Sequence, residues 1–83
     1  MKMVKIRLSS ARDVQRFVGV LVPLRGDFDL ISGEYVLDAR SLMGIFGLDL
    51  SKPLCLKMHD DRPENLAAIQ PFRVAMEEDD HGQ

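Results

Sequence analysis

Cysteine, tryptophan and long apolar runs are scarce or missing in this chain of 83 residues, which has one cysteine and no tryptophan. The single cysteine, Cys55, excludes an internal disulfide and a cysteine-based metal cluster, which favours the reducing cytosol. Its apolar neighbours at 54 and 56 predict that Cys55 is a small buried hydrophobic residue. The longest uncharged apolar run, 17–24, is far shorter than a membrane span, and the first residues lack the apolar core of a signal peptide. We therefore expect a cytoplasmic protein with no membrane partner.

A strong excess of one charge is also missing. The formal net charge is −2, and the chain has one tyrosine and four phenylalanines that could stack on bases. Nucleic-acid-binding proteins usually concentrate their basic residues on one face, whereas the basic residues here are scattered. We therefore expect no nucleic-acid partner.

The length predicts one domain over residues 1–83, with an acidic, solvated tail at about 77–83. Hydrophobic residues make up 46% and charged residues 29%, a composition typical of a folded protein. A chain this short buries only roughly 60% of its unfolded surface, so we do not expect a deep enclosed active site.

The periodicity of apolar residues predicts alternating strands and helices. Apolar residues alternate over 4–8, as in a half-buried strand, and then recur at helical spacing from 14 to 21. Ser10 and Asp13 form an N-terminal capping pair for this helix, and Pro23 ends it. Segments 28–31 and 35–37 form a hairpin, with Gly33 at the turn.

The second half of the chain repeats these signals. Apolar residues alternate again over 54–58. For the last helix we expect Asp61 as N-cap, Pro63 in the first turn and Glu64 completing a capping box. Its apolar residues extend to 76, and Pro71 should kink, shorten or interrupt it. The element order predicts an α+β fold, with a four-stranded antiparallel sheet covered on one face.

A short apolar helix is predicted over 41–48, with Ser41 as its N-cap. This segment and the residue before it read RSLMGIFGL, which resembles the regulatory-serine segment of the HPr family, the phosphocarriers of the bacterial sugar phosphotransferase system. Chain length and element order extend the resemblance over nearly the whole chain. The resemblance implies an HPr-like βαββαβα open-faced sandwich, with three helices on one face of the sheet, and we expect a monomer.

The same resemblance implies a phosphorylated histidine at the start of the first helix. The matching residues are Ser10, Ala11, Arg12 and Asp13, so Ser10 replaces the histidine. A serine phosphoester is too stable to pass phosphate along a relay, whereas a phosphohistidine is labile. Asp13 would also repel a phosphorylated partner. We therefore expect that this chain cannot relay phosphate from Enzyme I.

The two histidines are not expected to replace the missing one. His59 is expected to be a surface turn residue, with a substitute phosphocarrier or a metal ligand as the alternatives. His81 lies in the predicted tail.

Ser41 retains the second phosphorylation position of the family. As a helix N-cap its side chain is worth about 1 kcal/mol whether or not it is modified. A phosphate there would add roughly −1.5 to −2 charges at a helix N-terminus, where the helix dipole favours negative charge. We expect regulatory phosphorylation at Ser41 by an HPr kinase.

By resemblance, partners dock on the exposed side of the second helix, at Leu42, Met43 and Phe46. The alternative is that these side chains belong to the core. Arg12 is expected to bind an anion, such as a phosphate on a partner, unless it is only a solvated charge.

The sequence thus predicts a non-enzymatic regulatory or adaptor protein without cofactor or metal. Its expected partners are proteins: an HPr kinase, phosphotransferase-system components or a transcriptional regulator. The alternatives are a phosphocarrier that uses a non-standard residue, and a diverged binding module unrelated to sugar transport.

Overall fold

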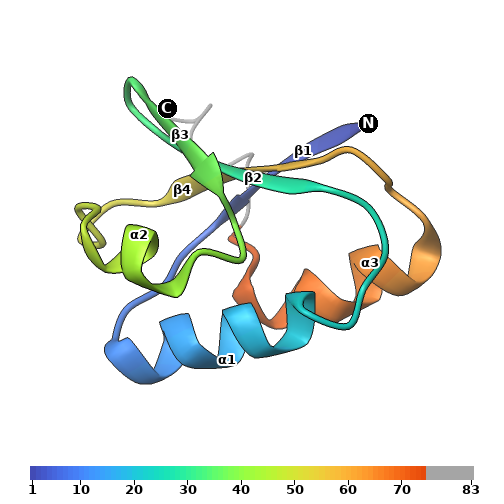
Figure 1. Cartoon of the computed structure of the whole chain (residues 1–83), viewed down its shortest axis with the longest axis horizontal. Coiled ribbons are helices and arrows are strands. Elements are labelled where there is room, and N and C mark those ends of the chain that lie inside the picture. The colour runs from blue at the N-terminus through green and yellow to red at the C-terminus, as the bar shows by residue number, and fades with distance from the viewer. Residues whose placement is uncertain (75–83) are drawn as a thin grey trace.

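The computed structural model describes residues 1–74 (Figure 1). The expected tail at about 77–83, His81 included, lies outside the described residues. The elements follow the order β1 (Lys2–Ile6), α1 (Ala11–Leu21), β2 (Phe28–Ser32), β3 (Tyr35–Asp38), α2 (Leu42–Phe46), β4 (Leu54–Met58), α3 (Pro63–Ile69) and the 3-10 turn η1 (Gln70–Phe72).

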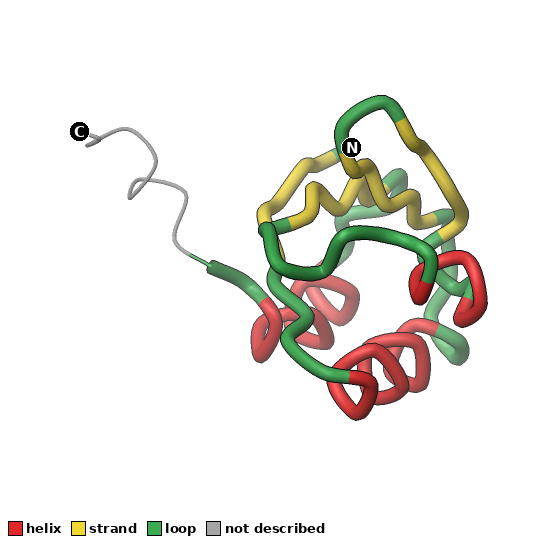
Figure 2. The backbone as a smooth tube through the Cα atoms, turned by 90° about the vertical axis from the view of Figure 1, so that its left-hand side faces the viewer, coloured by secondary structure: helices red, strands yellow, loops and turns green. Residues whose placement is uncertain are grey.

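The four strands form one antiparallel sheet in the order β1-β4-β2-β3. The three helices lie on one face of this sheet, and the other face carries none of the described helices (Figures 1 and 2). The predicted α+β class, the βαββαβα order and the open sandwich are therefore confirmed. Within residues 1–74, no helix is long and apolar enough to cross a bilayer.

The core lies between the sheet and the helices. Alternate residues of each strand point to it, because successive strand side chains face opposite sides. On α1 the buried stripe consists of Val14, Phe17 and Leu21, at the spacing the sequence predicts. The Phe17 and Phe72 rings pack edge to face with 5.3 Å between centroids, which ties α1 to η1. Apolar periodicity thus fixes which face of each element is buried.

Cys55 does not lie in this core, so the prediction that it is a buried hydrophobic residue was wrong. In β4 the core-facing residues are Leu54, Leu56 and Met58. Cys55 lies between two of them and therefore points to the open face, where it is half-buried. The neighbours in sequence are apolar, but the alternation of a strand places them on the opposite side.

Two turns use glycine where the backbone requires it. The hairpin pair Ser32–Tyr35 leaves Gly33 and Glu34 as the turn, and Gly33 has a φ of +61°, as the sequence predicts. Positive φ at the first of two turn residues is the pattern of a type II′ hairpin. Gly26 has a φ of +93°, and a Cβ there would lie 2.6 Å from the Asp60 Cβ.

Capping was predicted correctly for α1 and wrongly for α3. Helix α3 begins at Pro63, so Arg62 occupies the N-cap position and makes no side-chain cap. The Asp60 carboxylate instead accepts the Arg62 backbone N–H at 3.2 Å. The expected Asp61–Glu64 capping box fails because Pro63 is the first helical residue, which moves the cap one position along.

The last helix is shortened before Pro71, one of the effects expected of that proline. It ends at Ile69, and η1 follows over Gln70–Phe72, because Pro71 cannot continue the α-helical hydrogen bonding. The chain then returns to the outer side of β1: the Arg7 N–H donates to the Phe72 carbonyl and the Val74 N–H donates to the Lys5 carbonyl. Val74 therefore belongs to an extended segment and not to the helix.

Candidate functional site

Ser41 is the N-cap of α2, as predicted. Its Oγ accepts the Gly44 N–H at 3.2 Å, and its carbonyl accepts the Ile45 N–H at 3.0 Å. Its own N–H donates to the Asp38 carbonyl, which joins the helix start to the end of β3. The side chain is exposed, so the hydroxyl is open to solvent and to an incoming enzyme.

Gly44 makes this cap possible. A Cβ on Gly44 would lie 2.8 Å from the Ser41 Oγ and 3.0 Å from the Leu37 Cδ1. Both separations are shorter than ordinary van der Waals contact, so a larger residue would displace either the cap or the strand. The glycine in the RSLMG segment therefore has a packing reason in this structure.

The exposed side of α2 carries two of the three apolar residues predicted for a partner surface. Met43 is 79% exposed and Phe46 is 41% exposed. Leu42 is half-buried and packs against the core beside Ile45, which is fully buried. We call Met43 and Phe46 the α2 patch. Exposed large apolar side chains that lie together commonly mark a binding surface.

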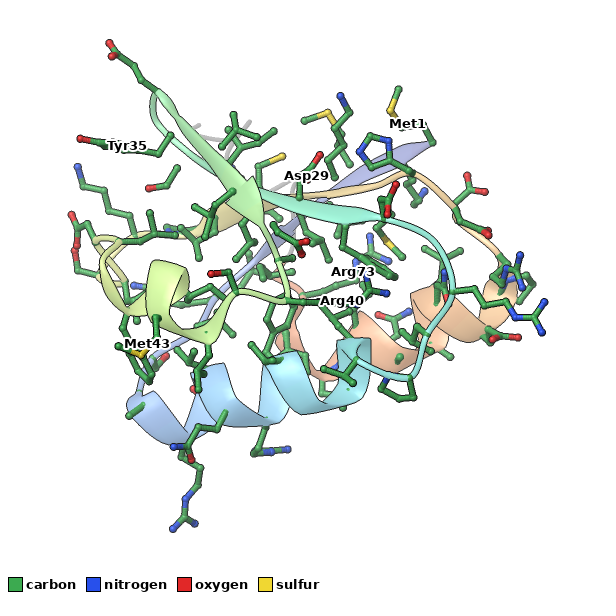
Figure 3. All side chains as sticks on the ribbon, viewed as in Figure 1. Met1, Asp29, Tyr35, Arg40, Met43 and Arg73 are labelled. Atoms are coloured by element: carbon green, nitrogen blue, oxygen red, sulfur yellow. The ribbon has the colours of Figure 1, made fainter. Side chains whose placement is uncertain are left out.

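Arg40, the basic residue before the serine, points away from the α2 patch. Its Nε donates to the Leu21 carbonyl at 3.1 Å, and its Nη2 donates to the Leu24 carbonyl at 2.8 Å. Its guanidinium also lies 4.9 Å from the centroid of the Phe28 ring. Figure 3 shows Arg40 directed toward the far end of α1. The arginine therefore stabilises the C-terminal end of α1, a role that the motif alone does not reveal.

At the start of α1, Ser10 also acts as a cap. Its Oγ accepts the Asp13 N–H at 3.2 Å, and the Asp13 carboxylate accepts the Ser9 N–H at 2.9 Å. Arg12 is exposed and makes no ion pair with any residue of 1–74. The Asp13 carboxylate is thus held at the start of α1 by the Ser9 N–H, and its negative charge would repel a phosphate bound at this helix start. The anion-binding prediction for Arg12 stays a prediction.

The two capped helix starts belong to neighbouring elements. Helix α2 contacts α1, and Figure 1 shows it above the N-terminal half of α1. In Figure 3, Met43 lies toward the first turns of α1. Met43, one residue of the α2 patch, therefore lies on the side of α2 that is nearest the start of α1 (Figure 3).

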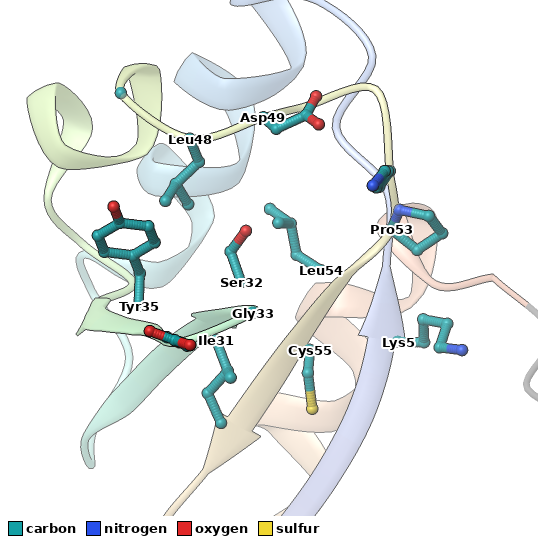
Figure 4. Close-up of a pocket in the computed structure, with 13 residues that line it drawn as sticks. Lys5, Ile31, Ser32, Gly33, Tyr35, Leu48, Asp49, Pro53, Leu54 and Cys55 are labelled. Carbon is teal, nitrogen blue, oxygen red and sulfur yellow. The ribbon is translucent and has the colours of Figure 1, made fainter.

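A groove lies at the other side of α2, between the β2–β3 hairpin and the segment leading to β4 (Figure 4). Its volume is ≈ 670 Å³, and Tyr35, Leu48 and Cys55 are among its lining residues. Partial burial raises the pKa of the Cys55 thiol, which keeps it protonated at neutral pH and therefore poorly nucleophilic. The sequence pointed to Cys55 only as a core residue and did not indicate this groove.

Asp49 borders the same groove and is held by its neighbour. The Ser51 hydroxyl and backbone N–H both donate to its Oδ1, and these bonds lower the pKa of the Asp49 carboxyl. A carboxylate that stays ionised and is already hydrogen-bonded is a weak proton donor or acceptor. Neither Cys55 nor Asp49 is therefore set up for nucleophilic attack or proton transfer in this groove.

His59 follows β4 on the surface, as predicted. Its Nε2 lies 2.9 Å from the Oδ2 of Asp29 on β2. Residues 1–74 contain no group of three or more potential ligands placed to hold a metal ion.

Comparison of the chain with family models, with curated proteins and with solved structures found no match. A function for this chain must therefore be inferred from the fold, from the two serine caps and from the α2 patch.

Proposed function

We propose that this chain is a cytoplasmic, monomeric, HPr-like regulatory or adaptor protein of the sugar phosphotransferase system, without enzymatic activity of its own. The observation that carries the proposal is the exposed α2 patch, Met43 and Phe46, beside the solvent-open hydroxyl of Ser41. An apolar surface next to a modifiable serine suits a protein whose partner binding responds to phosphorylation. The βαββαβα order, which the resemblance implies, supports the same proposal.

The proposal excludes a histidine relay. Ser10 stands at the start of α1 and uses its hydroxyl oxygen as a helix cap. His59 lies beside Asp29 of the sheet and not at the start of α1. Phosphate transfer through either residue would need chemistry or a position that the family does not use, which is why we favour the adaptor over the phosphocarrier alternative.

Phosphorylation at Ser41 is the regulatory step of the proposal. A phosphate on its Oγ would lie at the N-terminus of α2, next to the Gly44 N–H, where negative charge is tolerated. The modification would place an anion beside Met43 and Phe46 without requiring the fold to open. Partners that prefer an apolar surface should then bind less well, and partners with basic residues should bind better.

The first experiment incubates the protein with an HPr kinase and ATP and measures the intact mass. One phosphate per chain is expected, and Ser41→Ala should abolish it. The alanine variant loses about 1 kcal/mol of capping energy, so circular dichroism must show that it is still folded. A mass gain that survives in Ser41→Ala, or no gain in the native protein, would contradict the regulatory role of this serine.

A second experiment tests the α2 patch. Met43→Lys combined with Phe46→Lys should slow phosphorylation of Ser41 at least tenfold if the kinase docks there, about the effect of losing one well-packed apolar contact. Met43 is largely exposed, but Phe46 buries more than half of its surface, so the double variant should lose about 1–2 kcal/mol, and circular dichroism must show that it is still folded. Met3→Lys is the matched control, because Met3 is 51% exposed but lies on β1. Equal effects of the control and the double variant would exclude the α2 patch as the docking surface.

A further inference from the structure

The two edges of the sheet differ in how they are covered. The outer side of β1 pairs with the segment after η1, through the Val74 N–H and the Lys5 carbonyl. Strand β3 is the other edge, and it pairs only with β2 among the described residues. At its end the Asp38 carbonyl accepts the Ser41 N–H, so the uncovered stretch is Tyr35–Leu37. An uncovered edge presents backbone groups that another strand can pair with.

The register shows which backbone groups are uncovered. The Ala39 N–H donates to the Phe28 carbonyl, which continues the hydrogen-bonded pairs Leu30–Leu37 and Ser32–Tyr35. In an antiparallel ladder these pairs alternate with pairs whose N–H and C=O groups point away from each other. The N–H and C=O of Val36 therefore point outward, as does the N–H of Asp38.

An apolar hollow lies directly beside this edge. Its volume is ≈ 280 Å³, and it is lined by Tyr35, Val36, Leu37, Gly44, Gly47 and Leu48. The two glycines of the α2 segment provide the space, because they place no side chain between the helix and the strand. Tyr35 is 71% exposed and Val36 is 64% exposed, and Figure 3 shows the Tyr35 side chain projecting from the hairpin. We call this hollow with the outer side of Tyr35–Leu37 the β3 edge.

The charges at the β3 edge decide what can pair with it. Glu34 and Asp38 lie at its two ends, both exposed, and neither forms an ion pair with a described residue. A second copy paired antiparallel about Val36 would place Glu34 of one chain opposite Asp38 of the other, twice. Like charges directly opposite one another destabilise a strand pair. The acidic ends therefore disfavour a second copy and favour a basic partner.

We propose that the β3 edge binds an extended segment of another protein by strand addition. The segment's central residue pairs with the outward N–H and C=O of Val36. Its two neighbours point toward the helix side, where an apolar side chain enters the hollow above Gly44 and Gly47. The next residues on either side lie near Glu34 and Asp38. The recognised pattern is therefore basic, apolar, any residue, apolar, basic.

The β3 edge shares no residue with the α2 patch, and its proposal does not rest on phosphorylation of Ser41. The probe is a short capped peptide with the core sequence lysine–isoleucine–threonine–valine–lysine, added to the ¹⁵N-labelled full chain. The largest amide shifts are expected at residues 35–38, with slower solvent exchange of the Val36 and Asp38 N–H groups. The matched control peptide has glutamate in place of both lysines and should bind at least about fivefold more weakly, from the loss of two exposed ion pairs.

Three variants separate strand addition from other modes of binding. Val36→Pro removes an N–H that points outward, a change that an edge strand tolerates, and should weaken binding at least about tenfold. Gly47→Leu fills the hollow; Gly47 has a φ of −84° and an added Cβ would come no closer than 3.4 Å, so the fold should persist. Glu34→Gln with Asp38→Asn should abolish the preference for lysine over glutamate while retaining the Asp38 Oδ1 that accepts the Arg40 N–H.

Several results would overturn the proposal. The proposal is wrong if the lysine and glutamate peptides bind equally tightly, or if the largest amide shifts are centred on Met43 and Phe46. It is also wrong if both Val36→Pro and Gly47→Leu bind the lysine peptide as tightly as the native protein does. Self-association of the protein alone, with exchange protection at Val36, would show that the β3 edge pairs with a second copy instead.

Discussion

Replacing Asn65 with aspartate is expected to lower the free energy of unfolding by about 3–5 kcal/mol at pH 7, the range for an uncompensated buried charge. Asn65 is the one polar residue buried among the described residues, with no exposed surface. Its Nδ2 donates to the carbonyls of Arg25 and Asp60, at 3.0 and 2.9 Å. A carboxylate would place a negatively charged oxygen against both of these acceptors. The amide also ties together the two loops that meet at Gly26.

The effect should depend on pH in a defined direction. Burial against two carbonyl groups raises the folded-state pKa of the introduced carboxyl above the unfolded value of about 3.9. Between the two pKa values the folded state binds more protons than the unfolded state, so stability falls as pH rises. Below about pH 4 the carboxyl is protonated in both states, and the charge penalty is absent. Urea unfolding followed by circular dichroism at pH 4 and pH 7 measures the difference.

Gln15→Glu is the matched control for Asn65→Asp, because it adds the same charge at an exposed position of α1. Its effect should stay below about 0.5 kcal/mol. Asn65→Leu separates the lost hydrogen bonds from the buried charge: it should cost about 2 kcal/mol with no added pH dependence. Similar losses for Asn65→Asp and Gln15→Glu would mean that the amide does not join the loops.

Arg40→Met is expected to cost about 2–3 kcal/mol, because hydrogen bonds to a charged group are worth about 1.5–3 kcal/mol and the two bonds here share one side chain. The substitution leaves the carbonyls of Leu21 and Leu24 without their donors and removes the cation from the Phe28 ring. It keeps a side chain of similar length, so the loss of packing is small. Thermal unfolding of the variant measures the effect.

Two further variants locate the source of that loss. Arg40→Lys keeps the charge but not the planar donor arrangement. Compared with Arg40→Met, it should regain less than half of the lost free energy of unfolding. Arg12→Met removes an exposed arginine that has no ion pair in residues 1–74, and should cost less than about 0.5 kcal/mol. Equal losses at Arg40 and Arg12 would contradict the bridging role of Arg40. A larger loss of stability in Arg40→Met than in Arg12→Met would identify the arginine of the RSLMG segment as a structural residue.

The periodic signals predicted the fold well because they report burial directly. Alternation in β4 and the helical stripe of Val14, Phe17 and Leu21 each identify a buried face. The errors arose at apolar residues that do not face the core: one pairs with the edge strand β1, and one points to the open face of the sheet. Val74 carries the same apolar signal as a helix residue, yet it pairs with β1 after Pro71 has ended the helix. The apolar neighbours of Cys55 predict a core residue, yet the alternation of strand side chains places Cys55 on the open face.

The candidate site was predicted only where a short local pattern determines the geometry. The Ser10 and Ser41 caps depend on residues three positions away, so the sequence is sufficient to propose them. The contacts of Arg40 with Leu21 and Leu24, and those of Asn65 with Arg25, join segments far apart in the chain. Nothing in the local sequence indicates such partners, and the β3 edge likewise becomes visible only once the strand order is known.

The position of β1 also bears on how the chain folds during synthesis. Although β1 is made first, its partner in the sheet is β4, and its outer side meets residues near 74. Contacts between such distant parts of a chain form slowly, because a long loop must close before they are gained. The first strand therefore has no sheet partner until β4, Leu54–Met58, has left the ribosome. The hairpin of β2 and β3 needs only its own residues and a two-residue turn, so it is the earliest piece of sheet that the growing chain can assemble.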